Sequence, residues 1–515
     1  MTRQHLIAAF SALALITTAG LLSAGPLTPP VGPVAPSGKT SQEIFDKVAA
    51  VESRIAINAT NTPGDADSVY KITQPGSYYL TGNVDAPAGK SAIEIESASA
   101  DQVAIDLNGF GLVGTSATSL KGIASDLGTR VWVSNGSIRN FSQSAVVAEG
   151  PSVIIEKLQV LNCGHPNIRA YGSGIVRDCT VEGGPGTGFD ILGIFTIERC
   201  SATQVGGYGI LAVGVCLISD CAAFECASVG INTGDDISVR GCRAIGNQNA
   251  GVSVGKGCSV IGLESSGNLV GLIAGDGTRC ENVVCRGNQA GISLQNACRL
   301  LGCVSIGNTG PGVQAGSNFT AIDCVSSLNT SLTGDGFRAN VDATFINCVA
   351  TDNSADGFEC ADSSTFSGCT ANDNGGRGIF AFNAARISGC SVNNNVGVGI
   401  FGNNGCFIEN NLVRNSQQDG ISVNFSCAVI GNNCNGDGAA AGNHGAIRVT
   451  GQANRIDGNN ISYADRGLYL TSGGNVVVRN SVKGCTVNFD IVGGNDVGPI
   501  GSAATTTSPW ANLQF

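Results

Sequence analysis

The segment "ADGFECADSSTFSGCTANDNGGRGIFAFNAARISGCSVNNNVGVGIF", residues 355–401, contains a glycine followed by an apolar residue three times. The pairs Gly357-Phe358, Gly378-Ile379 and Gly399-Ile400 follow one another after 21 residues each time. A constant interval of this length is typical of repeat proteins, in which each repeat is a small structural unit that stacks on the next. The interval therefore predicts a stack of similar coils, and the remaining sequence shows how far that stack extends.

The same pair recurs from Gly188-Phe189 to Gly467-Leu468, nearly always after 20 or 21 residues. Two intervals are longer, before Gly336 and before Ala446, and they indicate insertions in turns. Within one period, residues 251–268 contain three short stretches of alternating apolar and polar residues, the pattern of half-buried strands. Strands this short bury their apolar side only by stacking on the equivalent strands of the next repeat.

Three short strands per ~21 residues predict an all-β fold, a single right-handed parallel β-helix. A leucine-rich repeat would need a recurring Leu framework, and a propeller blade needs about twice this period. We expect the β-helix over residues 93–497. Apolar residues at helical spacing in 41–55 predict a short capping helix for the first coil, and residues 498–515 are expected to cover the last one.

An Asn closes most periods. Stacked Asn side chains hydrogen-bond along a column, and Asn tolerates left-handed turn geometry. We interpret this column as a structural device and not as a ligand site. Its members are Asn247, Asn268, Asn288, Asn308, Asn329, Asn353, Asn374, Asn395 and Asn415.

Composition and charge exclude several classes of partner. The chain has 74 Gly among 515 residues, only 13% charged residues and a formal net charge of −11. Nucleic acids and anionic membrane surfaces require basic patches, so neither is expected as a partner. A metal cation or a glycan remains compatible with this charge. The sequence carries no signal for an oligomeric state.

The N-terminus predicts export. An apolar run from Leu6 to Leu22 follows Arg3 and is followed by small residues, which is the pattern of a secretory signal peptide. A membrane anchor is the alternative for the same run. We divide the chain into a signal peptide (1–25), a linker (26–40), an N-terminal cap (41–92), the β-helix (93–497) and a C-terminal cap or tail (498–515). The protein is thus expected to be secreted, at the cell surface or periplasmic, with no membrane span after signal removal.

Thirteen of the 21 cysteines of this chain fall in two columns. Alternation of apolar residues points both columns inward, so we interpret them as stacked buried thiols that fill a narrow core. Cysteines of neighbouring coils lie close enough for a disulfide, so a few disulfide bridges are the alternative to free thiols. One column comprises Cys200, Cys221, Cys242, Cys303, Cys324, Cys348, Cys369 and Cys390, and the other, five residues upstream in each period, comprises Cys216, Cys258, Cys298, Cys406 and Cys427.

The residues that point outward are the candidate binding surface. In each period the residue after the Gly-apolar pair, and the one two places later, should point away from the core. In coils from about 335 to 470 these columns bring together aromatic rings, amides and charges, which suit the faces and hydroxyls of sugars. Alternatively, these residues are covered by the 437–445 insertion, or they form an assembly contact. The candidate residues are Arg338, Glu359, Phe380, Phe382, Phe401, Asn403, Asn424 and Arg448.

Four aspartates are candidates for a Ca²⁺ site, which would be the only cofactor. Asp335 and Asp356 occupy the position before the Gly in adjacent coils, and Asp352 and Asp373 lie across the turn. Like charges at this distance repel unless a cation intervenes, and carboxylate oxygens are the ligands that Ca²⁺ prefers. An ion pair between Asp356 and Arg377 is the alternative.

Catalytic signatures are sparse. Residues 232–236 (NTGDD) match part of a polygalacturonase signature, but neither Gly-His-Gly nor Arg-Ile-Lys occurs, so Asp235 and Asp236 are expected in a surface turn. Outside the signal peptide the chain has only His165 and His444. The weak catalytic candidates are His444, Arg448, Asp419 and Tyr469.

The repeated Gly-apolar, Cys-x-Ala and Asn pattern resembles that of right-handed parallel β-helix repeat proteins, the pectate-lyase-like superfamily in its broad sense. Residues 57–83 and 103–114 are similar to the leader of exported β-helix repeat proteins of planctomycete-type bacteria. Such relatives include polysaccharide lyases, glycoside hydrolases, epimerases and proteins without a known reaction. Long insertions build active-site walls in this superfamily, and here only two short ones occur.

Two functions therefore remain. The favoured one is a non-catalytic exported protein for glycan binding, adhesion or surface architecture, with an extracellular polysaccharide or cell-surface component as partner. The alternative is a lyase, hydrolase or epimerase acting on an acidic polysaccharide along the 335–470 face. There Arg338 or Arg448 would neutralise a uronate carboxylate, and His444 or Tyr469 would exchange the C5 proton.

Overall fold

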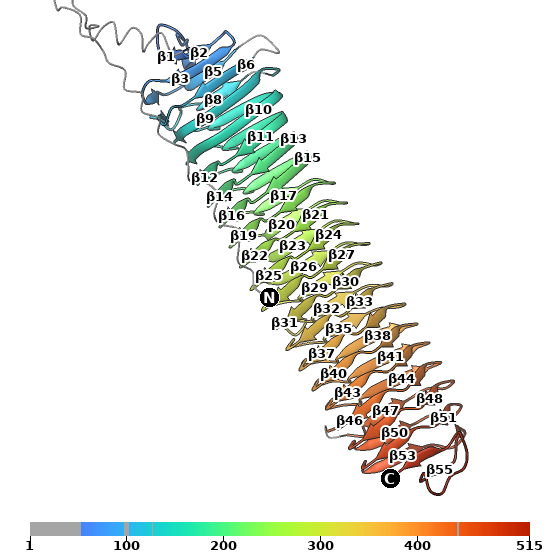
Figure 1. Ribbon diagram of the computed structural model, residues 1–515. Helices are drawn as coiled ribbons and strands as arrows, with labels where there is room; N and C mark the ends of the chain where they lie inside the picture. The colour runs from blue at the N-terminus through green and yellow to red at the C-terminus, as the bar shows by residue number, and fades with distance from the viewer. Residues whose placement is uncertain (1–52, 97–101, 126, 440–441) are drawn as a thin grey trace, which may run out of the picture. The chain divides into compact units, whose positions relative to one another are not determined.

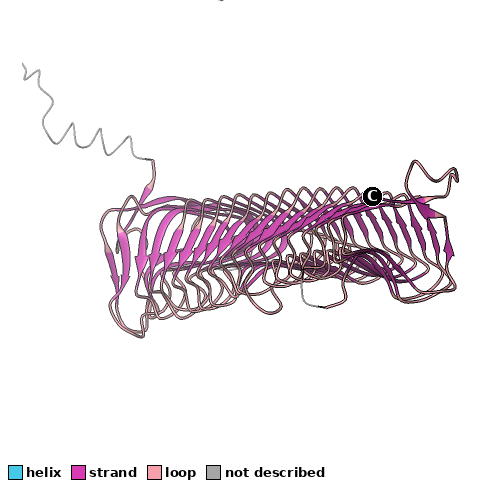
Figure 2. Cartoon of the chain, turned by 90° about the horizontal axis from the view of Figure 1, so that it is seen from below, coloured by secondary structure: helices cyan, strands magenta, loops and turns pink. Residues whose placement is uncertain are grey.

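The computed structural model describes residues 53–96, 102–125, 127–439 and 442–515. These residues form 56 β-strands and no helix (Figure 2), which confirms the all-β prediction. No helix of the described residues is long and apolar enough to span a membrane. The predicted signal peptide and linker, and all but the end of the predicted capping helix, lie outside the described residues. Ile55, the last residue of that predicted helix, begins strand β1 (Ile55–Ile57).

The strands stack in three parallel ladders that follow the chain from coil to coil (Figure 1). Phe358 pairs with Ile379, and Ile379 pairs with Ile400, so residues one period apart are neighbours, as the interval predicts. The first ladder carries the candidate surface of the late coils. It comprises β2 (Ser68–Ile72), β5 (Ser91–Ile95), β8 (Ile123–Ser125), β10 (Val146–Leu161), β11 (Ile168–Arg177), β13 (Phe189–Glu198), β15 (Ile210–Ser219), β17 (Ile231–Thr233), β20 (Ala250–Val254), β23 (Val270–Ala274), β26 (Ala290–Leu294), β29 (Val313–Ala315), β32 (Phe337–Ala339), β35 (Phe358–Cys360), β38 (Ile379–Asn383), β41 (Ile400–Asn404), β44 (Ile421–Phe425), β47 (Gly445–Val449), β50 (Arg466–Leu470) and β53 (Val487–Ile491).

Parallel pairing begins upstream of residue 93. Ile72 of β2 lies opposite Ile95 of β5, and β1 pairs with β3 (Gly76–Leu80). The described part of the segment expected as an N-terminal cap, 41–92, therefore consists of strands of the same ladders. β2 and β5 carry no Gly-apolar pair, so the periodicity of the later coils could not locate them. At the other end, β56 (Asn512–Gln514) pairs with β52 (Ser481–Lys483) and so adds a strand to the third ladder.

Strands β11, β13 and β15 are longer than the later ones, with ten residues each. In these coils the strands of the first two ladders are continuous, because a glycine at the bend replaces a turn. Gly172, Gly193 and Gly214 stack on one another with φ of 114°, 127° and 113°. A Cβ atom on Gly193 would lie 2.0 Å from the carbonyl oxygen of Gly172. Only glycine fits this column.

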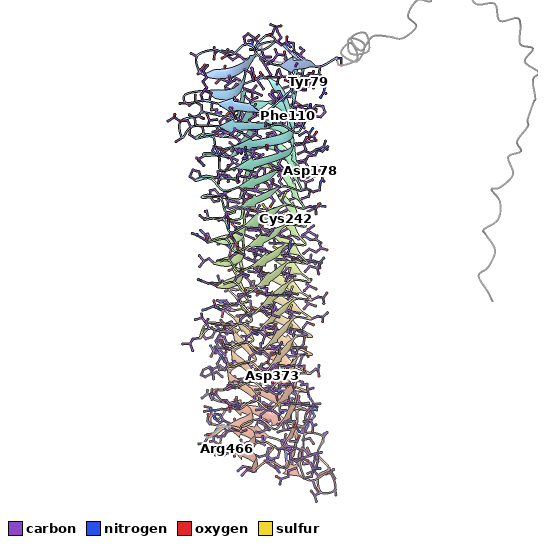
Figure 3. All side chains as sticks on the ribbon, turned by 90° about the vertical axis from the view of Figure 1, so that its left-hand side faces the viewer. Tyr79, Phe110, Asp178, Cys242, Asp373 and Arg466 are labelled. Atoms are coloured by element: carbon purple, nitrogen blue, oxygen red, sulfur yellow. The ribbon has the colours of Figure 1, made fainter. Side chains whose placement is uncertain are left out.

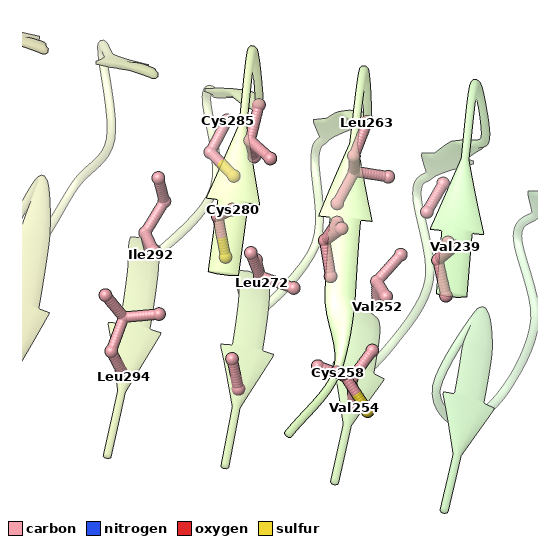
Figure 4. Close-up of a cluster of buried hydrophobic side chains, with 14 of the residues drawn as sticks. Val239, Val252, Val254, Cys258, Leu263, Leu272, Cys280, Cys285, Ile292 and Leu294 are labelled. Carbon is pink, nitrogen blue, oxygen red and sulfur yellow. The ribbon is translucent and has the colours of Figure 1, made fainter. Parts of the chain in front are cut away.

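The interior is a column of apolar side chains from successive coils. Figure 4 shows Val252, Leu272 and Ile292 from adjacent coils, with Cys280 and Cys285 among them. Farther along, Phe337 stacks on Phe358 with ring centroids 5.1 Å apart. All 21 cysteines are free, and 20 of them are buried, in agreement with the predicted inward thiol columns.

The predicted Asn column is present as a buried amide ladder. The backbone N–H of Asn247 donates to Asn268 Oδ1 at 2.8 Å, and Asn247 Nδ2 donates to the same oxygen at 3.0 Å. The pattern repeats up to Asn395, and Ser416 and Asp437 occupy the next two positions. Asn415, which the sequence assigned to this column, has positive φ and lies one place before it.

The cysteine columns continue as asparagine columns. The backbone N–H of Cys200 donates to Cys221 Sγ at 3.4 Å, whereas that of Cys390 donates to Asn411 Oδ1 at 2.9 Å. In the later coils the amide replaces the thiol as acceptor of the same N–H group. The continuation comprises Asn411, Asn432, Asn459, Asn480 and Asn512.

Candidate functional site

The outward column of β32 to β53 is the one that the sequence predicts. Strand register places its residues directly above one another, and Figure 3 shows how side chains such as Arg466 surround this part of the stack. The column changes from charged to aromatic and back to charged within eight coils. Its members in order are Arg338, Glu359, Phe380, Phe401, Ser422, Arg448, Tyr469 and Asp490.

Three phenylalanines form an aromatic cluster at the centre of this column. Phe380 stacks on Phe401 with centroids 5.3 Å apart, and the Phe382 ring lies 6.3 Å from Phe380. The Arg377 guanidinium covers Phe380 at 3.7 Å from its centroid. Phe380 and Phe401 are half-buried, and Phe382 is 45% exposed. The ring of Phe382 is therefore the one most available to a ligand.

A row of amides runs beside the aromatic cluster. Asn424 Nδ2 donates to Asn403 Oδ1 at 2.6 Å, and Asn403 Nδ2 donates to Asn383 Oδ1 at 3.0 Å. The Thr450 hydroxyl donates to Asn424, and Asn383 donates to Asp362. Asn383 was not predicted, because counting in steps of 21 places Phe382 in the coil below Asn403. The amides satisfy one another and present a half-buried polar edge.

Only two of the four predicted Ca²⁺ ligands come together. Asp335, Asp356 and Glu359 each place a carboxylate oxygen within 4.8 Å of the others. Asp352 and Asp373 are not part of this group. Both adopt positive φ in turns, where Asp352 accepts the Thr351 hydroxyl and Asp373 accepts Asn394 Nδ2.

Arg377 and Arg338 lie beside this acidic group. Arg377 Nη2 lies 2.6 Å from Asp356 Oδ2, which is the ion pair that the sequence left as the alternative. Burial, together with the carboxylates of Glu359 and Asp356, raises the pKa of Asp335 to about 7. Arg338 lies 3.7 Å from Glu359. The ion pair that the sequence left as the alternative is therefore present, whereas Ca²⁺ binding by Asp335, Asp356 and Glu359 stays a prediction.

The four catalytic candidates lie together in the coils after the second insertion. Asp419 is buried, and its Oδ1 accepts the Gly445 N–H at 2.9 Å. His444 Nδ1 is 3.6 Å from Asp419 Oδ1, and Arg448 Nη1 is 3.5 Å from Asp419 Oδ2. Arg448 also lies 5.4 Å from the Tyr469 ring centroid. The geometry thus joins a carboxylate, an imidazole, a guanidinium and a phenol.

Two further residues, Arg466 and Asp490, lie beside this group. Arg466 lies 4.6 Å from the Tyr469 ring centroid, and its Nε pairs with Asp490 at 2.7 Å. Asp490 follows Tyr469 in the outward column and could have been found by extending that column by one coil. Arg466 occupies the position before the Gly, and the 437–445 insertion obscured its register in the sequence.

Asp437 is a buried acid that the sequence did not indicate. It occupies an Asn position of the amide ladder, and its exposed fraction is 1%. Oδ1 accepts the Ser416 N–H at 2.9 Å, while Oδ2 has no hydrogen-bond partner among the described residues. Burial raises its pKa to about 7.

The NTGDD segment consists of the end of β17 and a turn that contains Asp235 and Asp236, as the sequence predicts. Asp235 and Asp236 are exposed, Asp236 has φ of 58°, and Asp235 Oδ1 accepts the Lys256 N–H at 2.7 Å. His165 is distant in sequence from the catalytic candidates, and its Nδ1 accepts the Thr187 N–H at 3.1 Å.

A comparison with protein families agrees with this architecture. The family described as "right handed beta helix region" matches residues 88–216 and 270–406, over half of the chain. The chain belongs to the right-handed β-helix family. A search of curated proteins found no match.

Solved β-helix structures are only distantly similar to this chain. The mannuronan C-5 epimerase AlgE6 A-module of Azotobacter vinelandii is 12% identical over 79% of this chain and 91% of that chain, with a TM-score of 0.26. The Dettilon tailspike protein is 12% identical over 67% and 61%, with a TM-score of 0.28. The periplasmic alginate epimerase AlgG is 11% identical over 77% and 78%, with a TM-score of 0.20. Similarity at this level concerns the fold and carries no argument about activity.

Proposed function

We propose that this protein is an exported, non-catalytic β-helix protein that binds an extracellular polysaccharide or cell-surface component along the 335–470 face. The apolar N-terminal run supports export. The similarity of residues 57–83 and 103–114 to exported repeat proteins of planctomycete-type bacteria, within the pectate-lyase-like superfamily, supports a place outside the cytoplasm.

The aromatic cluster is the observation that supports binding. Aromatic rings are scarce in this chain, at 5% of residues, yet three of them meet on one outward face. Ring faces bury the apolar face of a sugar, and an exposed aromatic patch with a polar border is typical of a contact surface. Because Arg377 fixes Phe380 from one side, the rings are held in place before a ligand arrives, which reduces the entropy lost on binding.

The polar groups around the rings supply orientation. The amides of Asn403 and Asn424 carry both donors and acceptors for sugar hydroxyls. Arg338 lies two coils before Phe380 and Arg448 two coils after Phe401, and both would bind a carboxylate on an acidic sugar. The face therefore suits an extended glycan that lies along the stack across several coils.

A glycan array with the secreted protein tests the proposal. Phe382→Ala and the double variant Phe380→Ala with Phe401→Ala should each weaken binding at least about tenfold, the loss expected for an aromatic contact of roughly 1.5 kcal/mol. Phe515→Ala is the matched control, because Phe515 is also exposed but lies at the C-terminal end. Unchanged binding by the double variant would remove the aromatic cluster from the proposal.

The group around Asp419 supports a second candidate function, a lyase or epimerase on an acidic polysaccharide. Arg448 would neutralise the uronate carboxylate, and His444 or Tyr469 would exchange the C5 proton, with Asp419 orienting His444 and Arg448. Incubation with pectate and alginate, with and without Ca²⁺, would release unsaturated products that absorb in the ultraviolet if a lyase is present, and an epimerase would exchange C5 hydrogen with solvent. His444→Ala should abolish either signal. A signal that survives this change would exclude His444, and no signal on a broad panel would leave the binding function alone.

A further inference from the structure

The third ladder carries a hollow of about 520 Å³ in four adjacent early coils. Its floor consists of the ends of β9 (Arg130–Arg139) and β10, followed by β12 (Thr180–Glu182) and β14 (Ser201–Thr203), which lie on one side of the stack (Figure 1). These strands pair in register, so the hollow belongs to a single ladder. Two outward columns line it, one with Ser137, Gln159, Thr180 and Ser201 and the other with Arg139, Leu161, Glu182 and Thr203.

The polar side chains of these two columns are unpaired. None of them forms a side-chain hydrogen bond or an ion pair with any residue that the structure describes. Polar side chains of neighbouring coils do pair nearby, as Gln204 Nε2 does with Glu225 Oε2 at 2.8 Å. The third-ladder hollow therefore keeps free donors and acceptors over four successive coils.

The lining contains one charge of each sign. Arg139 and Glu182 belong to the same column and lie two coils apart, with Leu161 between them. A ligand in the hollow has to suit both ions. Hydroxyl groups do so, because a hydroxyl accepts from a guanidinium and donates to a carboxylate. A polyanion would be attracted by Arg139 but repelled by Glu182.

A peptide or protein suits the hollow less well. β12 pairs with β10 on one side and with β14 on the other, so there is no strand edge to which a peptide could add. Protein interfaces are built around aromatic and Arg anchors in apolar pockets. The lining contains no aromatic residue among the residues described, and Leu161, at 38% exposed, is its exposed apolar side chain.

We propose that the third-ladder hollow binds a neutral polysaccharide whose chain runs along the stack from β9 to β14. The coils repeat every ~4.8 Å, close to the length of one pyranose residue, so successive sugars meet successive coils. The first column binds their hydroxyls, and Leu161 packs against the apolar edge of a ring. This site lies on a different ladder and in earlier coils than the 335–470 face, and it does not depend on the function proposed for that face.

Isothermal titration calorimetry of the full chain with mannohexaose and with cellohexaose measures the binding. We expect at least one of the two to bind. Gln159→Ala with Thr180→Ala should raise its dissociation constant at least about tenfold, because two hydrogen-bonding side chains are removed. Gln248→Ala with Thr330→Ala is the matched control, because both side chains are exposed outside the hollow, and it should bind like the wild type. Circular dichroism and thermal unfolding verify that each variant keeps the fold.

The charge of the ligand is tested with matched sugars. Each hexasaccharide is compared with its counterpart in which C6 is oxidised to a carboxylate. The oxidised sugar should bind at least about tenfold more weakly than the neutral one, and Glu182→Gln should reduce this difference. Tighter binding of the oxidised sugar by the wild type would overturn the assignment to a neutral chain.

The variants also separate this site from the late coils. Phe380→Ala with Phe401→Ala should leave hexasaccharide binding unchanged, and Gln159→Ala with Thr180→Ala should leave glycan binding by the 335–470 face unchanged. A wild-type chain that binds neither neutral hexasaccharide at low millimolar concentration would overturn the proposal and leave the late face untouched. Binding that is lost only in the phenylalanine variant would place the sugar on the late face and would overturn it as well.

Discussion

The early coils and the late coils of this protein share one interior and differ at their surfaces. In both, most inward columns are apolar, since each coil has to cover its neighbours, and buried Asn columns run beside them. In the early coils β11 to β15 present aliphatic side chains around a glycine bend, whereas in the late coils β32 to β50 present rings, amides and charges. The comparison teaches that the repeat determines the interior, while each outward position is free to change from one coil to the next. Function is therefore sought in the outward columns.

The glycine bend is the largest structural difference, and removing it should have the largest effect. Gly193→Ala places a Cβ atom 2.0 Å from the Gly172 carbonyl oxygen at a φ that L-residues avoid. We expect the free energy of unfolding to fall by at least about 3 kcal/mol. Urea denaturation followed by circular dichroism measures it. Gly493→Ala, where a Cβ atom meets nothing within 4 Å, should stay within about 0.5 kcal/mol of the wild type. Equal effects of the two changes would contradict the role of the bend.

The late coils contain the one acid in the amide ladder, and Asp437→Asn should raise stability. Burial raises the pKa of Asp437 to about 7 in the folded chain, whereas the unfolded chain releases the proton near the ordinary carboxyl pKa of 3.8. Stability is therefore lost as pH rises from about 4 to about 7. The free energy of unfolding of the variant should exceed that of the wild type by roughly 2–4 kcal/mol at pH 8 and by little at pH 4.

Urea denaturation at pH 4, 6 and 8 gives the difference between the two proteins. Asn374→Asp, in the intact part of the same ladder, is the matched opposite and should introduce the same pH dependence. A difference between the wild type and Asp437→Asn that does not change with pH would show that Asp437 is ionised throughout.

Much of this arrangement follows from the sequence, because the repeat fixes which residues are neighbours. The step of 21 residues places Phe380 beside Phe401 and Asp335 beside Asp356 without coordinates. Three features do not follow. The first coils lack the Gly-apolar pair, and the step alone does not distinguish a glycine bend from a turn at Gly193. Glu359 joins Asp335 across the edge of a strand, a contact that depends on side-chain direction and not on the period.

The acidic group of Asp335, Asp356 and Glu359 in the late coils is tested by removing Arg377. Arg377→Met removes the cation from Asp356 and Phe380, and it should lower stability by about 1 kcal/mol, since the pair is only partly buried. It should also raise the affinity for Ca²⁺, because Asp335 and Asp356 then face each other without Arg377, and Arg338, 3.7 Å from Glu359, is the cation that remains beside the group. Isothermal titration with Ca²⁺ measures both proteins. Binding by the wild type with a dissociation constant below about 1 mM would show that the acidic group holds Ca²⁺ even beside Arg377.

The smallest effect on stability is expected at the corner position, where early coils have Cys and late coils have Asn as the acceptor of the same backbone N–H group. Cys200 and Cys221 occupy the corner position in early coils, and Asn411 and Asn432 occupy it in late coils. Both side chains accept the N–H of the coil below, and both donate to the equivalent carbonyl oxygen, Cys200 Sγ to Val176 at 3.6 Å and Asn411 Nδ2 to Ile387 at 3.0 Å. At the boundary, Cys390→Asn would place a further amide directly below Asn411, where its Nδ2 has the Asn411 oxygen within reach.

Cys390→Asn should therefore change the free energy of unfolding by less than about 1 kcal/mol, because the new amide finds its partners. Cys242→Asn is the sharper comparison, since the coil above it offers Leu263 and no amide. That variant buries an amide with fewer partners and should lose about 1–3 kcal/mol. If the free energy of unfolding falls equally in the two variants, side-chain volume determines which residue fits the corner position. The change from thiol to amide along the stack would then have no hydrogen-bonding basis.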